Sequence, residues 1–183
     1  MKISIKAFLA VILLTFMPVI SQAQNNDLDP ENTIYLDLKD GRVVIKMFPD
    51  VAPNHVNKIK KLTREGYYDG SYFHRVIRRF MAQTGAPKGE RTGGSGKNID
   101  AEFSDLSHYK GIVSMARPPD INGADSQFFI MRAYNPGLDG QYTIWGEVVS
   151  GMRYVDNIKI GEGSDFADPD KIVKMQVAAD VNE

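Results

Sequence analysis

The chain has 183 residues and a formal net charge of −1 at pH 7, a balance that gives no electrostatic case for nucleic-acid binding. It contains no cysteine, which excludes disulfides, thiol catalysis and lipid attachment through a cysteine. Three histidines, His55, His74 and His108, fall in different predicted elements without the spacing of metal ligands. We therefore expect neither a metal nor another cofactor.

The first 23 residues have the pattern of a signal peptide. Lys2 and Lys6 precede an apolar run at 7–20, and Ser21-Gln22-Ala23 places small residues at the two positions that signal peptidase reads. We expect cleavage after Ala23; an uncleaved anchor is the alternative, and Pro18 argues against it. Cleavage would leave 20 basic and 23 acidic residues, a net charge of about −3. The mature chain is then expected to be exported, periplasmic and without stable membrane association.

A polar, flexible lead-in is predicted over 24–32, followed by one domain over 33–183. Two alternating segments at 33–39 and 42–48 are joined by Asp40-Gly41, a strong signal for a hairpin turn. Pro53 suits the first turn of an amphipathic helix of about twelve residues that ends before Gly66.

The stretch Tyr72–Gly85 (YFHRVIRRFMAQTG) carries the most informative pattern. Its first half alternates like a strand and places Arg75 on the same face as Phe73 and Ile77. Met81 and Gln83 share a face if the second half is also extended. By itself this pattern fits either a lined groove or a barrel strand whose arginine extends to water.

The rest of the chain predicts further strands and one short helix. A glycine-rich loop at 85–100 is long enough to suggest a functional role. Four strands are expected at 111–116, 127–131, 142–149 and 171–177, and a helix at 151–160. Seven or eight short strands with two helices favour a mainly β protein built as an antiparallel barrel.

Three motifs with catalytic associations are incomplete. Gly96-Lys97 resembles the end of a phosphate-binding loop, but Arg91 and Asn98 replace the required glycine and hydroxyl residue. Ser107–Lys110 matches Ser-x-x-Lys without the other elements of a penicillin-binding site, and no Gly-x-Ser-x-Gly is present. Hydrolase and metalloenzyme functions therefore lack a set of residues to support them.

Several stretches in order resemble cyclophilins, the cyclosporin-binding class of peptidyl-prolyl isomerase. They are YFHRVIRRFMAQTG at 72–85, TGG at 92–94, GIVSMA at 111–116, DSQFFI at 125–130, and LDG at 138–140 with IWG at 144–146. The resemblance spans Thr33–Val177 and implies a closed eight-stranded antiparallel barrel capped by two helices. With the signal peptide, the chain resembles an exported bacterial member.

The resemblance also implies roles for individual residues. Arg75 aligns with the catalytic arginine. Phe80, Met81, Phe129 and Leu138 align with the family's pocket for the proline ring. Gln83, Ala116 and Gln127 align with the residues that hold the peptide backbone. The implied enzyme is a monomer that needs no cofactor and acts on proline-containing unfolded or flexible polypeptides.

Four positions depart from the family pattern. Tyr142 stands where many members have histidine, and we expect it to line the pocket and keep activity. Gly137 replaces a tryptophan of cyclosporin-sensitive members, so we expect weak or no cyclosporin binding. Arg117 replaces an asparagine at the groove edge and bears on peptide preference, and Arg91 replaces a loop glycine. A binding module or holdase, with incidental catalysis, is the alternative function.

Overall fold

The computed structural model describes residues 28–181, so the predicted signal peptide and its cleavage site lie outside the described residues. The strands are β1 (Thr33–Leu38), β2 (Gly41–Met47), β3 (Arg75–Val76), β4 (Met81–Thr84), β5 (Ile112–Met115), β6 (Phe128–Met131), β7 (Ile144–Ser150) and β8 (Lys174–Val177). The helices are α1 (Pro53–Arg64) and α2 (Met152–Asp156), with short 3-10 helices η1 (Pro30–Asn32), η2 (Pro136–Leu138) and η3 (Ala178–Asp180). Within residues 28–181, no helix combines the length and apolar character needed to cross a bilayer.

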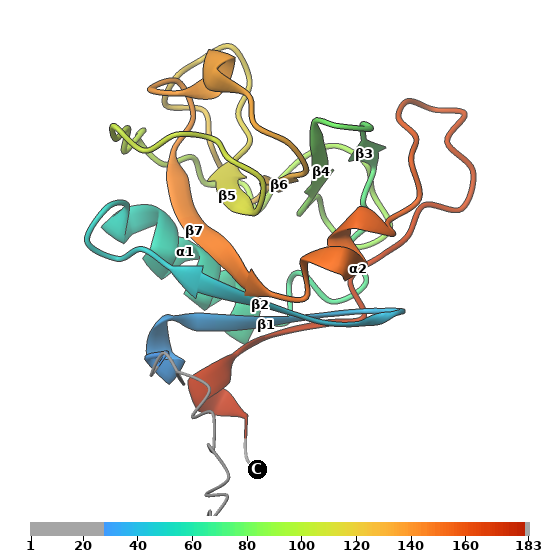
Figure 1. Ribbon diagram of the computed structural model, residues 1–183, viewed down its shortest axis with the longest axis horizontal. Coiled ribbons are helices and arrows are strands. Elements are labelled where there is room, and N and C mark those ends of the chain that lie inside the picture. Colours follow the sequence, from blue (N-terminus) through green and yellow to red (C-terminus); the bar gives the residue numbers. More distant parts are fainter. Residues whose placement is uncertain (1–27, 182–183) are drawn as a thin grey trace, which may run out of the picture.

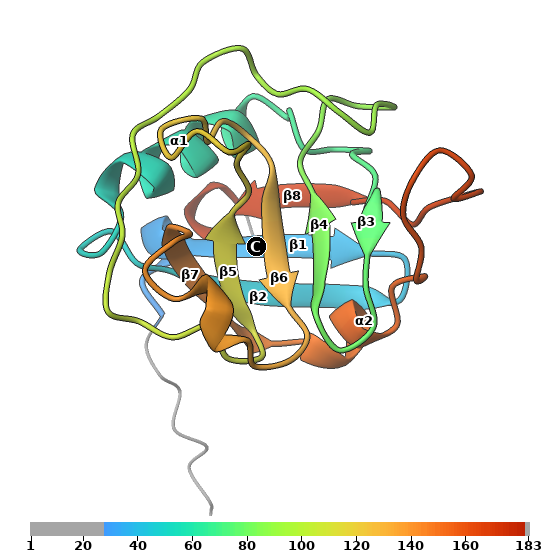
Figure 2. The same cartoon turned by 90° about the horizontal axis from the view of Figure 1, so that it is seen from above.

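All eight strands form one antiparallel sheet in the order β3-β4-β6-β5-β7-β2-β1-β8. The sheet curls so that β3, β4, β6 and β5 lie over β8, β1 and β2, with α1 and α2 on opposite sides (Figures 1 and 2). Its edges meet just before β3 and β8, where Tyr72 and Lys171 form an isolated bridge and the Phe73 N–H donates to Asp170 O at 2.8 Å. The expected barrel is therefore closed by an isolated bridge between these segments, without a full strand ladder.

The sheet buries apolar residues on both faces. On β6, Phe128 and Ile130 enter the main core inside the curled sheet, while Phe129 and Met131 belong to a second cluster on the outer face. This placement follows from the alternation of side chains along a strand. It explains why this segment reads as a continuous apolar run, and it provides an apolar outer surface for a site.

Helix α1 has the twelve residues that the sequence predicts and buries Val56, Ile59 and Leu62. Its N-terminus has no side-chain cap from Ala52, the residue in the capping position. The carboxylate of Glu102, from the loop before β5, accepts hydrogen bonds from the Asn54 and His55 backbone N–H groups, both at 3.0 Å. A remote carboxylate therefore satisfies N–H groups that have no partner within the helix.

Three segments differ from the expectations. The strand expected at 72–77 is reduced to β3. Its start is lost because Phe73 pairs with Asp170 at the closing bridge, and its end because the chain turns after Ile77, where Phe80 N–H donates to Ile77 O at 3.2 Å. Helix α2 is shorter than expected. The lead-in ends in η1, whose Glu31 pairs with Arg64 of α1 at 2.7 Å, so these last residues belong to the folded domain.

Candidate active site

A small cavity of about 110 Å³ opens on the outer face of the sheet. It is lined by Arg75, Phe80, Met81, Gln83, Ala116, Arg117, Phe129, Leu138 and Tyr142. All of these residues were singled out from the sequence. The structure therefore brings together nine residues that the chain separates by up to 67 positions.

Strand register places the central residues of the cavity in one row. Arg75 on β3 pairs with Gln83 on β4, and Gln83 pairs with Phe129 on β6. Because paired residues of neighbouring strands point to the same face, a cation, an amide and an aromatic ring lie side by side. Met81, two residues before Gln83 on β4, faces the same side of the sheet.

The apolar part of the cavity is well packed. Met81 and Phe129 are only 2% and 4% exposed. The Tyr142 ring meets Phe129 edge to face, with centroids 5.6 Å apart. Phe80 and Leu138 are partly buried against the same outer cluster. These side chains form an apolar depression whose buried members have little freedom to rearrange.

Arg75 provides the cation at the rim of the cavity. Its guanidinium carbon lies 5.9 Å from the centre of the Phe80 ring, and its side chain is 42% exposed. Its Nε donates a hydrogen bond to Glu162 Oε2 at 3.0 Å. Its two Nη groups have no hydrogen-bond partner among residues 28–181, so they are available to a ligand in the cavity.

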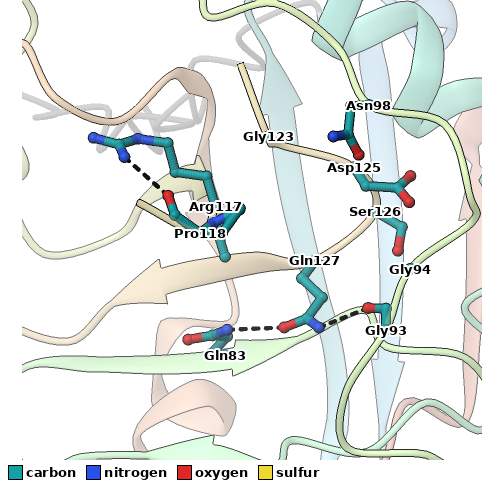
Figure 3. Close-up of a pocket in the computed structure, with 11 residues that line it drawn as sticks. Gln83, Gly93, Gly94, Asn98, Arg117, Pro118, Gly123, Asp125, Ser126 and Gln127 are labelled. Carbon is teal, nitrogen blue, oxygen red and sulfur yellow. Dashed lines mark hydrogen bonds between the residues drawn. The ribbon is translucent and has the colours of Figure 1, made fainter. Parts of the chain in front are cut away.

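Gln127, the remaining residue singled out from the sequence, lines a larger neighbouring cavity of about 440 Å³ (Figure 3). The two cavities share Gln83, Ala116 and Arg117. Gln83 Nε2 donates to Gln127 Oε1 at 2.9 Å, and Gln127 Nε2 donates to the carbonyl of Gly93 at 2.7 Å (Figure 3). These two hydrogen bonds fix both side-chain amides and leave the side-chain oxygen of Gln83 free to accept from another donor.

Arg117 uses its guanidinium on the protein's own backbone. Nε and Nη2 donate to Gln141 O at 3.1 and 3.0 Å, and Nη1 donates to the carbonyls of Pro118 and Pro119 at 3.0 and 3.2 Å. The guanidinium also lies 4.9 Å from the centre of the Tyr142 ring. Figure 3 shows it directed away from Gln127. Its geometry fits a brace for Tyr142 and the adjacent loops.

Sequence reasoning missed a buried network behind Phe129. His108 stacks on Phe129 with centroids 6.2 Å apart, its Nδ1 lies 2.8 Å from Asp139 Oδ1, and its Nε2 lies 3.0 Å from Ser114 Oγ. The hydrogen bond with His108 lowers the pKa of Asp139. A hydrolase triad has the same three residue types, but His108 and Ser114 are fully buried here and cannot meet a substrate. The network therefore supports Phe129 from behind.

The other two histidines have structural surroundings as well. His74 is 8% exposed, and burial lowers its pKa. Burial also lowers the pKa of His55, which bonds Glu102. Among residues 28–181, no group of three His, Cys, Asp or Glu side chains could hold a metal ion.

Comparisons with known proteins identify the family of this chain. Residues 33–177 match the family model "Cyclophilin type peptidyl-prolyl cis-trans isomerase/CLD". The chain is 50% identical over 167 residues to a probable peptidyl-prolyl cis-trans isomerase of Brucella suis, covering 83% of this chain and 85% of that protein. It is 40% identical over 133 residues to peptidyl-prolyl cis-trans isomerase B of Bacillus subtilis, covering 71% and 92%.

Two solved structures have the same fold. A cyclophilin from Hirschia baltica is 28% identical, with a TM-score of 0.75, and the match covers 85% of this chain and 77% of that one. A Cryptosporidium parvum cyclophilin crystallised in the presence of the dipeptide Ala-Pro is 27% identical, with a TM-score of 0.72 and coverages of 79% and 98%. The chain belongs to the cyclophilin family and is a peptidyl-prolyl cis-trans isomerase.

Proposed function

We propose that this enzyme isomerises Xaa-Pro bonds of exported proteins without a covalent intermediate, and that Arg75 is its catalytic residue. The observation that carries the proposal is the row of Arg75, Gln83 and Phe129 beside the small apolar cavity. The other cation in the lining, Arg117, already donates four of its five N–H groups to backbone carbonyls within residues 28–181 and keeps a single one, on Nη2.

The chemistry explains why an arginine is needed. Rotation about a prolyl bond crosses a barrier of about 20 kcal/mol, because amide resonance is lost in the twisted state. In that state the proline nitrogen regains its lone pair and accepts a hydrogen bond that neither planar isomer accepts equally well. An Nη–H of Arg75 aimed at this lone pair stabilises the transition state selectively. Arginine is always protonated and cannot act as an acceptor, which suits this role.

The apolar residues and the amides divide the remaining tasks. Met81, Phe129 and Leu138 enclose the proline ring and exclude water, so the ring stays fixed while the preceding carbonyl turns. Gln83 and Gln127, whose amides hydrogen-bond each other at 2.9 Å, hold the peptide backbone next to the rotating bond. Excluding water also strengthens the contact from Arg75 to the proline nitrogen.

The decisive experiment compares cis-trans exchange of a short Xaa-Pro peptide by the wild type and Arg75→Ala. We expect kcat/KM to fall about 100-fold, at the lower end of the 2.7–4 kcal/mol typical for losing a preorganised donor, because Arg75 is 42% exposed. Arg75→Lys is the matched control: it keeps the charge but loses the forked donor geometry, and it should recover only part of the rate. Equal rates for wild type and Arg75→Ala would contradict the catalytic role.

The same variant separates catalysis from simple binding. If Arg75→Ala protects an unfolded client from aggregation as well as the wild type does, the groove also acts as a holdase.

Export is tested separately: the mature protein recovered from the periplasm should begin at Gln24. A mature N-terminus at Met1 would contradict both the cleavage and the proposed exported substrates.

A further inference from the structure

We propose that Glu162 is a positioning residue for catalysis, which fixes the guanidinium of Arg75 so that both Nη groups face the proline pocket. The inference rests on the proposed role of Arg75. Glu162 Oε2 accepts the hydrogen bond from Arg75 Nε at 3.0 Å, and this is the only ion pair of Arg75 among residues 28–181. Glu162 lies in the loop 161–168, which Figure 2 shows beside β3.

The backbone holds Glu162 next to Arg75. Gly161 and Val76 form an isolated antiparallel bridge, with hydrogen bonds of 2.8 and 3.0 Å in the two directions. Glu162 comes directly after Gly161, and Arg75 comes directly before Val76 on the antiparallel partner segment. The bridge therefore brings the backbones of Glu162 and Arg75 close together. A Cβ on Gly161 would lie 2.3 Å from the Phe166 ring, so only glycine permits this close packing. The bridge and the buried Phe166 fix where the Glu162 side chain starts.

Arg91 holds the far side of the same loop. Its Nη1 donates to the carbonyl of Gly163 at 2.7 Å, and its Nη2 donates to the carbonyl of Phe166 at 2.6 Å. Lys159 adds a hydrogen bond from Nζ to Ala167 O at 2.6 Å. The arginine that departs from the family pattern in the glycine-rich loop thus braces the loop that carries Glu162.

The ion pair between Glu162 and Arg75 favours catalysis because it uses the Nε atom of Arg75. A carboxylate on Nε restricts the torsions of the long Arg75 side chain and leaves Nη1 and Nη2 unpaired. Free arginine side chains lose rotamer freedom when they bind, so prior fixation reduces that cost in the transition state. Because Glu162 and Arg75 are 56% and 42% exposed, the ion pair itself is weak and the expected effect is modest.

The test compares Glu162→Ala, Glu162→Gln and Asp165→Ala. We expect Glu162→Ala to lower kcat about three-fold with KM little changed, the size of effect given by one exposed ion pair. Glu162→Gln keeps an acceptor oxygen and should retain most of the activity. Asp165→Ala removes the same charge from the same loop, where, within residues 28–181, the Asp165 side chain accepts a hydrogen bond only from Ser164, and it should leave kcat unchanged. Unfolding midpoints of all three variants should match that of the wild type.

The Arg75→Ala background distinguishes positioning from a general structural effect. Glu162→Ala should have no further effect there, because the side chain that it positions is gone. Arg91→Ala should lower kcat about two-fold, and combining it with Glu162→Ala should add nothing. An unchanged or raised kcat for Glu162→Ala, or the same loss with and without Arg75, would overturn the inference. The proposed catalytic role of Arg75, in contrast, fails if Arg75→Ala alone leaves the rate unchanged.

Discussion

Removing the Glu102 carboxylate should destabilise the fold, because this side chain caps α1 from outside the helix. It accepts hydrogen bonds from Asn54 N and Nδ2 at 3.0 and 2.9 Å and from His55 N and Nδ1 at 3.0 and 2.7 Å. Although burial alone would raise the pKa of Glu102, these hydrogen bonds bring it below its usual value. The carboxylate is therefore charged at neutral pH and faces the positive end of the helix dipole.

The size of the effect follows from what each donor finds afterwards. In Glu102→Ala, the exposed donors of Asn54 turn to water, and losing the cap costs about 1 kcal/mol. The His55 ring is fully buried, so its Nδ1 is left unsatisfied at a cost of about 1–3 kcal/mol. We expect a loss of about 3 kcal/mol in the free energy of unfolding. The melting temperature should then fall by roughly 6–12 °C.

Urea and thermal unfolding followed by circular dichroism provide the assay. Glu102→Gln, which keeps acceptor oxygen but not charge, should lose about half as much, and Asp105→Ala, an exposed acidic control in the same loop, should stay within about 0.5 kcal/mol of wild type. The lowered pKa of Glu102 means that its stabilisation is present above about pH 4.5 and is lost as the pH falls through the folded value. The difference between wild type and Glu102→Gln should therefore shrink below that pH. A loss under about 0.5 kcal/mol for Glu102→Ala at neutral pH would refute the capping argument.

Two further predictions concern the groove. Arg117→Ala should raise KM about two- to five-fold in the peptide assay with kcat nearly unchanged. The reason is that Tyr142 loses its cation–π contact and the adjacent loop loses the hydrogen bonds that hold it. A loss in kcat as large as that of Arg75→Ala would instead make Arg117 catalytic. Cyclosporin should inhibit the wild type weakly, and Gly137→Trp should lower the inhibitory concentration about ten-fold or more, on the scale of one buried aromatic contact. A Cβ at this position would lie 3.1 Å from Asn135 Oδ1, so the Asn135 side chain must shift slightly to admit it. Strong inhibition of the wild type would contradict the second prediction.

The sequence predicts the members of the site better than their partners. Alternation along single strands is a local property, so it correctly placed Met81 with Gln83 on one face and identified the apolar run at β6. The contact between Arg75 and Glu162 joins residues 87 positions apart, and nothing local marks Glu162 as its partner. The position of His108 depends in the same way on a tertiary contact with Phe129.

Side-chain direction was also beyond the sequence. Arg117 was expected as a cation at the groove edge, and it does line both cavities, but three nearby carbonyls take up its guanidinium. Which acceptors an arginine finds depends on loop geometry, which composition does not specify. Strand β3 was overestimated for a similar reason, because Phe73 pairs with Asp170 across the closing bridge and leaves the ladder.

The row of Arg75, Gln83 and Phe129 makes isomerase activity a reporter of strand register. The row exists only while β3, β4 and β6 pair in one alignment. A slip of one residue on β4 would turn Gln83 inward and bring Ala82 beside Arg75. Refolded protein with such a slip would keep its β-sheet circular dichroism but lose catalysis. The ratio of isomerase activity to the circular-dichroism signal of the β-sheet therefore measures the fraction of molecules that have refolded in the native strand alignment.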